Sequence, residues 1–238
     1  MKGKKNTKRF IRYGLYVLGM AALAFGLTLN TKVTLGVSPI ISFPYAISQI
    51  WGINFGDMTF IWYGIFVALE LMLHLRRGAS DRKRQVILDL LQLPVSLLFT
   101  RFMNLLSAVI PVFETTYPQS FAGSVWGRIF FLLVAVVFTG LGAALALKMR
   151  VVPNPGDGLV QALSDFTKIK VGTVKNNFDL SCVALAVIIS LVATQRIIGV
   201  GIGTLIAIIG VGRIVSVFNV FWGNQFEHFI LEANKDNN

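Results

Sequence analysis

The stretch "KMRVVPNPGDGLVQALSDFTK", residues 148–168, interrupts a chain that is otherwise strongly apolar. Hydrophobic residues make up 55% of the 238 residues, and long apolar runs lie on both sides of this stretch. Asn154 followed by Pro155 is typical of a helix start, because asparagine caps the first turn and proline is tolerated at its first position. The apolar spacing that follows predicts a short helix over 155–167.

The composition limits the class of protein. Only 14% of the residues are charged and the mean hydropathy is +0.69, whereas a soluble domain usually carries about 25% charged residues. We therefore expect an all-helical polytopic membrane protein whose main partner is the lipid bilayer. A net charge of +11 in a soluble protein would suggest nucleic acid, but the positive residues here are confined to particular loops, so no nucleic-acid partner is expected.

Six apolar runs approach or exceed the roughly 20 residues needed to cross a bilayer. They lie at about 10–30, 56–75, 86–110, 125–147, 174–194 and 198–221. Two further segments, about 39–51 and 155–167, are predicted to be helices of about half that length. A dozen residues at about 1.5 Å each reach roughly 18 Å, which is about half of a bilayer.

The distribution of Lys and Arg predicts which segments cross. If the short segments do not cross, the basic amino terminus, the basic loop 76–84 and the basic group in 148–175 all lie on one side. If both crossed, the loop 76–84 would lie on the opposite side. The first arrangement obeys the positive-inside rule, so we predict six spans in an inner membrane with both termini cytoplasmic.

The chain contains an internal repeat. Residues 10–75 align without a gap on the residues 116 positions further along, with thirteen identities. The rarer residues among these identities fall at the breaks between helices, namely Lys32/Lys148, Pro39/Pro155 and Gly56/Gly172. Ser38 before Pro39 repeats the arrangement of Asn154 before Pro155. Each half therefore consists of a span, a short helix and two further spans.

Three crossings per half place the two halves upside down relative to each other, because three is an odd number. We predict two inverted repeats whose short helices are re-entrant and enter from opposite faces, with their positive N-terminal ends meeting. Short Gly/Pro-interrupted segments at matching places of inverted repeats indicate a transporter's binding site. The predicted organisation is a basic cytoplasmic tail 1–9, a repeat 10–110, an external loop 111–124, a repeat 125–221 and a cytoplasmic tail 222–238.

The pattern resembles the YczE/YitT-type family of bacterial integral membrane proteins. The likeness lies in "LGVSPIISFPYAIS" (35–48), "GINFGD" (52–57), "VVPNPGDGLVQALS" (151–164) and "GIGTLIAIIGVGRIV" (201–215). It covers the whole chain apart from the tails. The resemblance implies a multispan inner-membrane protein from a family whose biochemical role is largely uncharacterised. It therefore supports the architecture more than any activity.

The predicted solute site lies between the starts of the short helices, at Ser38, Pro39, Asn154 and Pro155. Asp157 would lie one turn into the second short helix, as a contact for a substrate or a proton. The alternative is that this acid only stabilises the first turn, where the helix dipole favours negative charge.

Arg101 and Arg213 lie about fifteen residues into their predicted spans, roughly 22 Å along a core of about 30 Å. Ionisable groups inside spans are functional candidates, so both join the predicted site. The alternative is that their side chains reach back to the membrane surface. No cofactor or metal is expected, because Cys182 is the only cysteine and the two histidines, His74 and His228, are far apart in the sequence.

We expect membrane transport by alternating access of a small polar or anionic solute, secondary or passive because the chain has no Walker motif. A first alternative is a non-transporting membrane factor that binds or assists a partner protein, which apolar packing in place of a cavity would favour. A second is a membrane-embedded enzyme, which would need Asp157 and Asp179 facing one another at depth. No His-Glu-x-x-His or Gly-x-Ser-x-Gly motif occurs, so no enzyme is expected. A homo-oligomer stays open.

Overall fold

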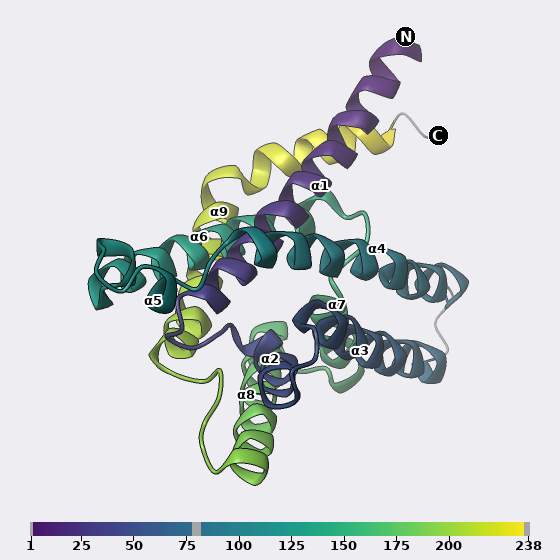
Figure 1. Cartoon of the computed structure of the whole chain (residues 1–238). Helices are drawn as coiled ribbons and strands as arrows, with labels where there is room; N and C mark the ends of the chain where they lie inside the picture. The colour runs from purple at the N-terminus through teal and green to yellow at the C-terminus, as the bar shows by residue number, and fades with distance from the viewer. Residues whose placement is uncertain (1, 78–81, 236–238) are drawn as a thin grey trace.

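The computed structural model describes residues 2–77 and 82–235, and every regular element within them is a helix (Figure 1). The all-helical class predicted from composition is therefore confirmed. The elements are α1 (Lys2–Lys32), α2 (Pro39–Trp51), α3 (Phe55–Arg77), α4 (Arg82–Val109), α5 (Phe113–Thr116), the 3-10 helix η1 (Phe121–Gly123), α6 (Val125–Met149), α7 (Pro155–Thr167), α8 (Val171–Thr194) and α9 (Ile202–Lys235).

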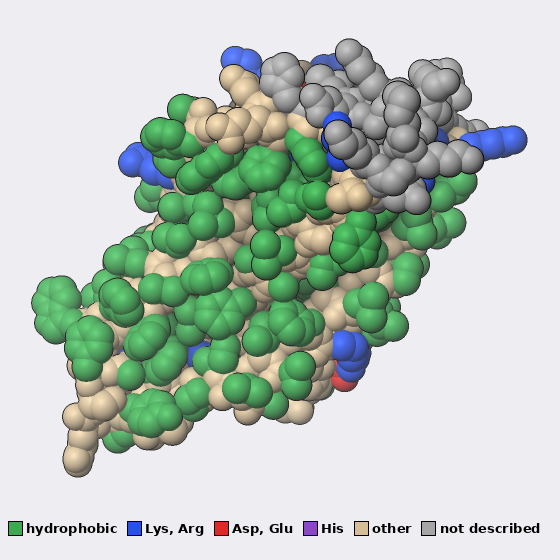
Figure 2. Space-filling view, turned by 90° about the horizontal axis from the view of Figure 1, so that it is seen from above, with side chains coloured by type: hydrophobic (Ala, Val, Ile, Leu, Met, Phe, Trp, Pro, Cys, Tyr) green, Lys and Arg blue, Asp and Glu red, His purple; other side chains and the backbone are tan. Residues whose placement is uncertain are grey.

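Six stretches of the described residues are helical, long and apolar enough to cross a membrane, as the sequence predicts. Many of their apolar side chains face outward; Val192 and Val220, for example, are 78% and 79% exposed. Figure 2 shows hydrophobic side chains over most of one face, with Lys and Arg mainly near its edges. A surface of this kind belongs in lipid, so the chain is a multi-pass membrane protein. The six stretches are Thr7–Lys32, Phe55–Arg76, Lys83–Thr116, Val125–Met149, Val171–Thr194 and Ile202–Glu227.

The last long helix differs from the predicted span 198–221 at both ends. It begins later because Gly199 has a φ of 75° and accepts a backbone hydrogen bond from Val37 (N to O, 2.8 Å). Gly203 N donates to Leu35 O (2.7 Å), so the start of α9 is bonded to the segment that follows α1. At its other end α9 continues without a break beyond residue 221.

The helices α1 and α6 pack along each other at close range. Gly26 on α1 lies against the backbone of Ala135, where an added Cβ atom would come within 2.7 Å of the carbonyl oxygen. Gly142 on α6 lies in the same way against the carbonyl oxygen of Gly19 (2.6 Å). The two contacts are equivalent at the offset of 116, since Gly26 matches Gly142 and Gly19 matches Ala135.

Two equivalent arginines bind opposite ends of this helix pair. Arg12 Nε donates to Met149 O (2.8 Å), at the last residue of α6. Arg128 Nε donates to Val33 O (2.9 Å), just after the last residue of α1. Met149 and Val33 are also 116 positions apart. Each half therefore binds the same point of the other half, and α1 and α6 run antiparallel.

The two short helices form over the predicted ranges, as α2 and α7. Each has proline in its first turn and is followed by a residue with left-handed backbone, Gly52 (φ 66°) and Lys168 (φ 63°). These two residues are again 116 positions apart. α2 packs against α8, and α7 packs against α3, so each short helix contacts a long helix of the other half.

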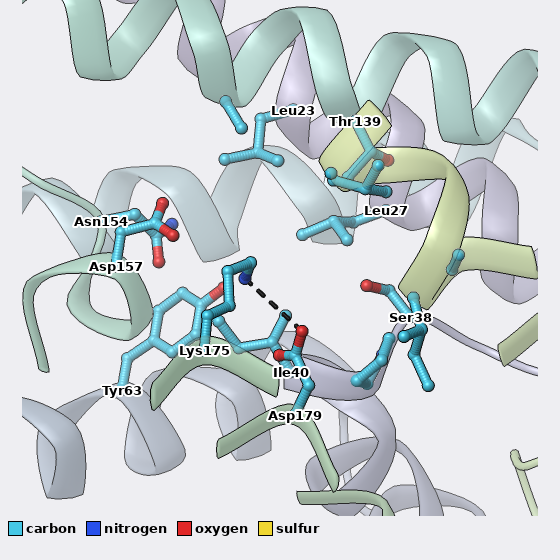
Figure 3. Close-up of a pocket in the computed structure, with 16 residues that line it drawn as sticks. Leu23, Leu27, Ser38, Ile40, Tyr63, Thr139, Asn154, Asp157, Lys175 and Asp179 are labelled. Carbon is cyan, nitrogen blue, oxygen red and sulfur yellow. Dashed lines mark ion pairs between the residues drawn. The ribbon is translucent and has the colours of Figure 1, made fainter. Parts of the chain in front are cut away.

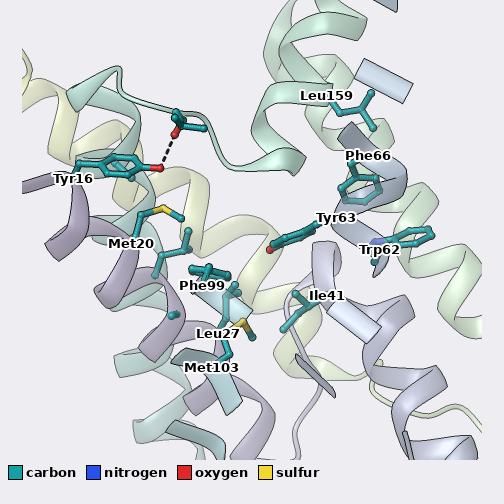
Figure 4. Close-up of a cluster of buried hydrophobic side chains, with 14 of the residues drawn as sticks. Tyr16, Met20, Leu27, Ile41, Trp62, Tyr63, Phe66, Phe99, Met103 and Leu159 are labelled. Carbon is teal, nitrogen blue, oxygen red and sulfur yellow. Dashed lines mark hydrogen bonds between the residues drawn. The ribbon is translucent and has the colours of Figure 1, made fainter. Parts of the chain in front are cut away.

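A cluster of buried side chains joins α1, α3 and α4 to the short helices (Figure 4). Tyr63, Ile41 and Met103 are almost completely buried in it. At its edge, the Tyr16 hydroxyl donates to Val152 O (2.9 Å), which attaches α1 to the segment before α7. The aromatic and aliphatic core thus positions the start of α2 and the start of α7 relative to α3.

The two halves differ in how their last two long helices pack. In the first half, α3 packs along α4. In the second half, α8 and α9 make no comparable contact within the described part of the chain, and Figure 1 shows them pointing in different directions. α9 packs along α6, as its equivalent α4 packs against α1. The other extensive contacts between long helices are matched in the two halves, so only the packing of α3 along α4 has no equivalent in the second half.

Candidate functional site

A small polar cavity lies where the first turns of α2 and α7 meet (Figure 3). Its volume is about 60 Å³. One water molecule needs roughly 10–15 Å³ on the same measure, so the space suits a few waters or one small solute. Long helices of both halves complete the wall. The polar and ionisable side chains that line it are Ser38, Tyr63, Thr139, Asn154, Asp157, Lys175 and Asp179.

The first turns of the two short helices touch at this cavity. Gly156, the second residue of α7, packs against the side chain of Ile40, the second residue of α2. A Cβ atom at position 156 would come within 2.0 Å of Ile40 Cδ1, so any larger residue there would require the Ile40 side chain to move. A helix N-terminus carries a partial positive charge of roughly half a unit, and two such charges meet here.

The two cap residues behave differently. Asn154 Oδ1 accepts a hydrogen bond from Gly156 N at 3.2 Å, so asparagine caps α7 as its sequence position predicts. Ser38 holds the same position before α2, but its side chain makes no capping hydrogen bond. Figure 3 shows its hydroxyl turned toward the cavity instead. This hydroxyl is therefore available to a bound molecule.

Three ionisable side chains lie at the cavity. Lys175 Nζ is 3.6 Å from Asp179 Oδ2, and the Asp179 side chain is only 10% exposed. Figure 3 places Asp157 on one side of this ion pair and Ser38 on the other. The two acids that an enzyme would need, Asp157 and Asp179, thus line one cavity, although Lys175 pairs with one of them.

Tyr63 supplies a buried hydroxyl to the same cavity. The residue is 1% exposed, and its hydroxyl has no hydrogen-bond partner among the residues that the structure describes. Figure 3 shows the hydroxyl on the cavity side of the ring, and the Asn154 side chain is close enough to interact with it. Leaving a buried hydroxyl unpaired costs about 1–3 kcal/mol, so such groups are rare. This atom points most directly to a ligand.

The lining of the cavity follows the internal repeat. Four pairs of lining residues are 116 positions apart: Leu23/Thr139, Leu27/Ala143, Ser38/Asn154 and Tyr63/Asp179. Matching positions of the two halves therefore border the same space. Their chemistry differs, since a phenol in one half corresponds to a carboxylate in the other. The lining residues thus occupy equivalent positions in the two halves but differ in charge.

Most of the predicted site residues come together. Ser38, Pro39, Asn154 and Asp157 all line the cavity, and they come from the starts of both short helices. Pro155 is buried in the first turn of α7 and does not line the space itself. The proline therefore acts through the backbone, by starting α7 at this point.

Arg101 and Arg213 do not reach the cavity. Arg101 forms an ion pair with Asp57, and its side chain is 51% exposed. Arg213 is exposed although its neighbour Gly212 lines the cavity. Successive residues of a helix point about 100° apart, so Arg213 faces away from the site. The two arginines thus lie deep along their helices without facing the interior.

Three polar residues of the site were not predicted, Tyr63, Thr139 and Lys175. The charge pattern groups Lys175 with the cytoplasmic basic residues, but it lies in the second turn of α8 and reaches the cavity. The repeat held a usable signal for Tyr63, because it aligns with Asp179. A polar residue in a span that aligns with an acid in the other half is a reasonable candidate for a shared cavity.

Six long apolar helices, five of which line a polar cavity, define a multi-pass helical membrane protein with an internal polar site. The chain belongs to the Family of unknown function (DUF6198), whose model matches residues 10–220. The match includes both short helices and every residue that lines the cavity. Neither a curated protein nor a solved structure matches the chain. The resemblance to the YczE/YitT-type family stays a prediction.

Proposed function

We propose that this protein is a transporter that carries a small polar solute through the cavity between α2 and α7, by alternating access. The unpaired Tyr63 hydroxyl carries the proposal, because it lies buried among apolar helices beside Asp157, Lys175 and Asp179. Ionisable groups inside a membrane are costly and commonly mark the path of a substrate or ion. Seven of its sixteen lining residues are polar or ionisable, whereas continuous apolar packing at this place would favour a non-transporting factor.

The paired contacts of the two halves support an inverted repeat. Arg12 and Arg128 bind equivalent carbonyls at opposite ends of α1 and α6, as a two-fold axis in the membrane plane would require. On this interpretation α2 and α7 are re-entrant helices that enter from opposite faces. Transporters built from such repeats change access by moving one part against another around a fixed site.

The charges of the cavity favour a solute without a large net charge. Asp157 and Asp179 contribute two negative charges and Lys175 contributes one positive charge. The two helix N-termini together add roughly one further positive charge, so the sum is about zero. A cavity of about 60 Å³ corresponds to about four water molecules. A small zwitterion or neutral polar molecule fits both limits, and a monoanion is the second choice.

We infer that the protein lies in a bacterial inner membrane with both termini in the cytoplasm. The positive-inside rule supports this orientation, because the basic segments gather on one side in the six-span arrangement. The structure agrees in bringing basic ends together: Arg12 Nη2 donates to Arg150 O at 2.7 Å. Fusion of a reporter that is active on only one side of the membrane to each terminus tests the orientation.

Uptake into proteoliposomes tests the transport proposal. Four small probes of different charge are compared, namely glycine, acetate, inorganic phosphate and glycerol, and we expect glycine to enter fastest. Asp157→Asn should slow uptake about tenfold or more, because a hydrogen bond to a charged group contributes about 1.5–3 kcal/mol. Asp165→Asn is the matched control, since Asp165 is on the same helix and does not line the cavity.

Two results would contradict the proposal. One is that no probe enters faster than into protein-free liposomes. The other is that Asp157→Asn and the unaltered protein transport the same probe at the same rate. Either result would favour the alternative of a membrane factor that has kept the fold without transporting anything.

A further inference from the structure

A second polar cluster is buried between α3 and α4, and none of its residues lines the cavity. Glu70, His74 and Asp89 are 3%, 9% and 2% exposed. Each offers one atom that can bind a metal ion, and these atoms lie within 4.8 Å of one another. Glu70 and His74 are four residues apart on α3, so they share one helix face. Asp89 meets them from α4, with its Oδ2 atom 2.8 Å from His74 Nδ1.

The two carboxyl groups of this cluster need a compensating charge. No lysine or arginine among the described side chains forms an ion pair with Glu70 or Asp89. Two buried carboxylates this close cannot both stay ionised unless a positive charge lies between or beside them. Among the described residues, this charge can come only from protons on the cluster itself or from a bound cation.

Gln92 provides a second and independent observation. Its side chain is completely buried, and its Nε2 donates to Glu70 Oε2 at 2.8 Å. Its carbonyl oxygen Oε1, on the other side of the amide, has no hydrogen-bond partner in the described part of the chain. A half-turn of the amide would give the cluster this oxygen as a further ligand and place Nε2 where Oε1 now lies. A divalent cation then accounts for two carboxylates and one imidazole that are buried together, and Gln92 can complete its ligands.

We propose that Glu70, His74, Asp89 and Gln92 bind a divalent transition-metal ion such as Zn²⁺ or Mn²⁺. Bonds of about 2.0–2.2 Å place adjacent ligand atoms about 3–4 Å apart, which small side-chain movements achieve here. One imidazole with oxygen ligands and no thiolate suits these ions better than Cu(I). Two carboxylates neutralise the charge of the ion, which matters at a buried site.

The sequence alone does not predict this site. His74 is isolated from the other histidine, and the acids that complete the cluster come partly from another helix, after the residues 78–81 that lie outside the described chain. Glu70 also lies against α7, since a Cβ atom on Gly158 would come within 2.5 Å of its Oε2. The metal proposal needs only the observed fold and does not rest on the proposed transport.

Metal content and thermal stability test the proposal on the purified full-length protein. After removal of metal with a chelator, addition of ZnCl₂ or MnCl₂ and desalting, about one ion per chain should remain, and the melting temperature should rise. His74→Ala and Asp89→Asn should lose both the ion and the temperature shift. His228→Ala, at the only other histidine, and Asp57→Asn, at an exposed acid, should bind like the unaltered protein.

Several outcomes would overturn the metal site. The unaltered protein could retain neither ion, in which case the cluster holds protons only. His228→Ala could lose the ion as fully as His74→Ala, which would indicate adventitious binding. If His74→Ala does not fold, the isosteric variants Glu70→Gln and Asp89→Asn decide instead, and retention of the ion by both contradicts the proposal.

Discussion

The hydroxyl of Tyr63 is buried and makes no hydrogen bond to the described residues. A substitution that removes it therefore tests the role of this group in solute binding separately from its role in folding. Tyr63→Phe should leave the free energy of unfolding unchanged or raise it by up to about 1–3 kcal/mol, because an unsatisfied polar group disappears. Uptake should fall about 2–10-fold, since one neutral hydrogen bond to the solute contributes about 0.5–1.5 kcal/mol. Thermal unfolding in detergent and uptake into proteoliposomes measure the two effects.

Tyr16 is the matched control for this substitution, because its hydroxyl donates to Val152 O and lies outside the cavity. Tyr16→Phe should lower the free energy of unfolding by about 0.5–1.5 kcal/mol and leave uptake unchanged. If Tyr63→Phe destabilises the protein as Tyr16→Phe does, the Tyr63 hydroxyl has a structural partner. The cavity would then lose its clearest sign of a ligand.

At the scale of elements, the contact between α1 and α6 depends on glycine. Gly26→Ala should lower the free energy of unfolding by about 1–3 kcal/mol, because the added methyl group meets backbone atoms of α6. Gly64→Ala on α3 is the control, since no atom lies within 4 Å of its added Cβ. It should stabilise the protein by up to about 1 kcal/mol through helix propensity. Equal effects in chemical unfolding would argue against the close packing.

The short helices were predictable because their limits are local. Ser38-Pro39 and Asn154-Pro155 start them, and a helix start needs only the residues beside it. The start of α9 was not predictable, because the conformation of Gly199 depends on a backbone hydrogen bond from Val37, which is far away in the sequence. Cap chemistry therefore predicts an element's limits where no distant backbone competes for them.

The residues of the site also differ in whether local sequence could predict them. Asp157 was predictable because it lies one turn after a recognisable helix start. Lys175 and Tyr63 lie on helices that are apolar on the lipid side and the core side alike, so the sequence period does not show which face is internal. Arg101 and Arg213 were chosen for their depth along a helix, but depth does not specify the direction of a side chain, and both point away from this cavity.

Labelling of introduced cysteines tests how the short helices enter the membrane. Ile53 and Ile169, 116 positions apart, follow α2 and α7 and are both exposed. On a Cys182→Ser background, an impermeant maleimide should label Ile53→Cys in intact cells, and Ile169→Cys only after the inner face is opened. The reason is that re-entrant helices of inverted repeats end on the faces from which they enter. Labelling of both from one side contradicts the inverted repeat.

At the scale of the whole molecule, we interpret the unequal packing of the two halves as one of two conformations that the protein can adopt. The first half has α3 packed along α4, while the second half has α8 and α9 apart. If the halves are equivalent by descent, each should be able to adopt the packing of the other. An exchange of the two packings would move the cavity's opening from one face to the other without moving the contact between Ile40 and Gly156.

Distances between spin labels test this exchange. Leu69 and Leu105 are exposed positions on α3 and α4, and their equivalents at the offset of 116 are Leu185 and Phe221 on α8 and α9, also exposed. In lipid, on a Cys182→Ser background, each cysteine pair should give two distance populations. Addition of the transported probe should shift them in opposite directions, because one half closes as the other opens. A single, unresponsive distance in each pair would make the asymmetry a fixed feature of the fold, and alternating access would then need a different moving part.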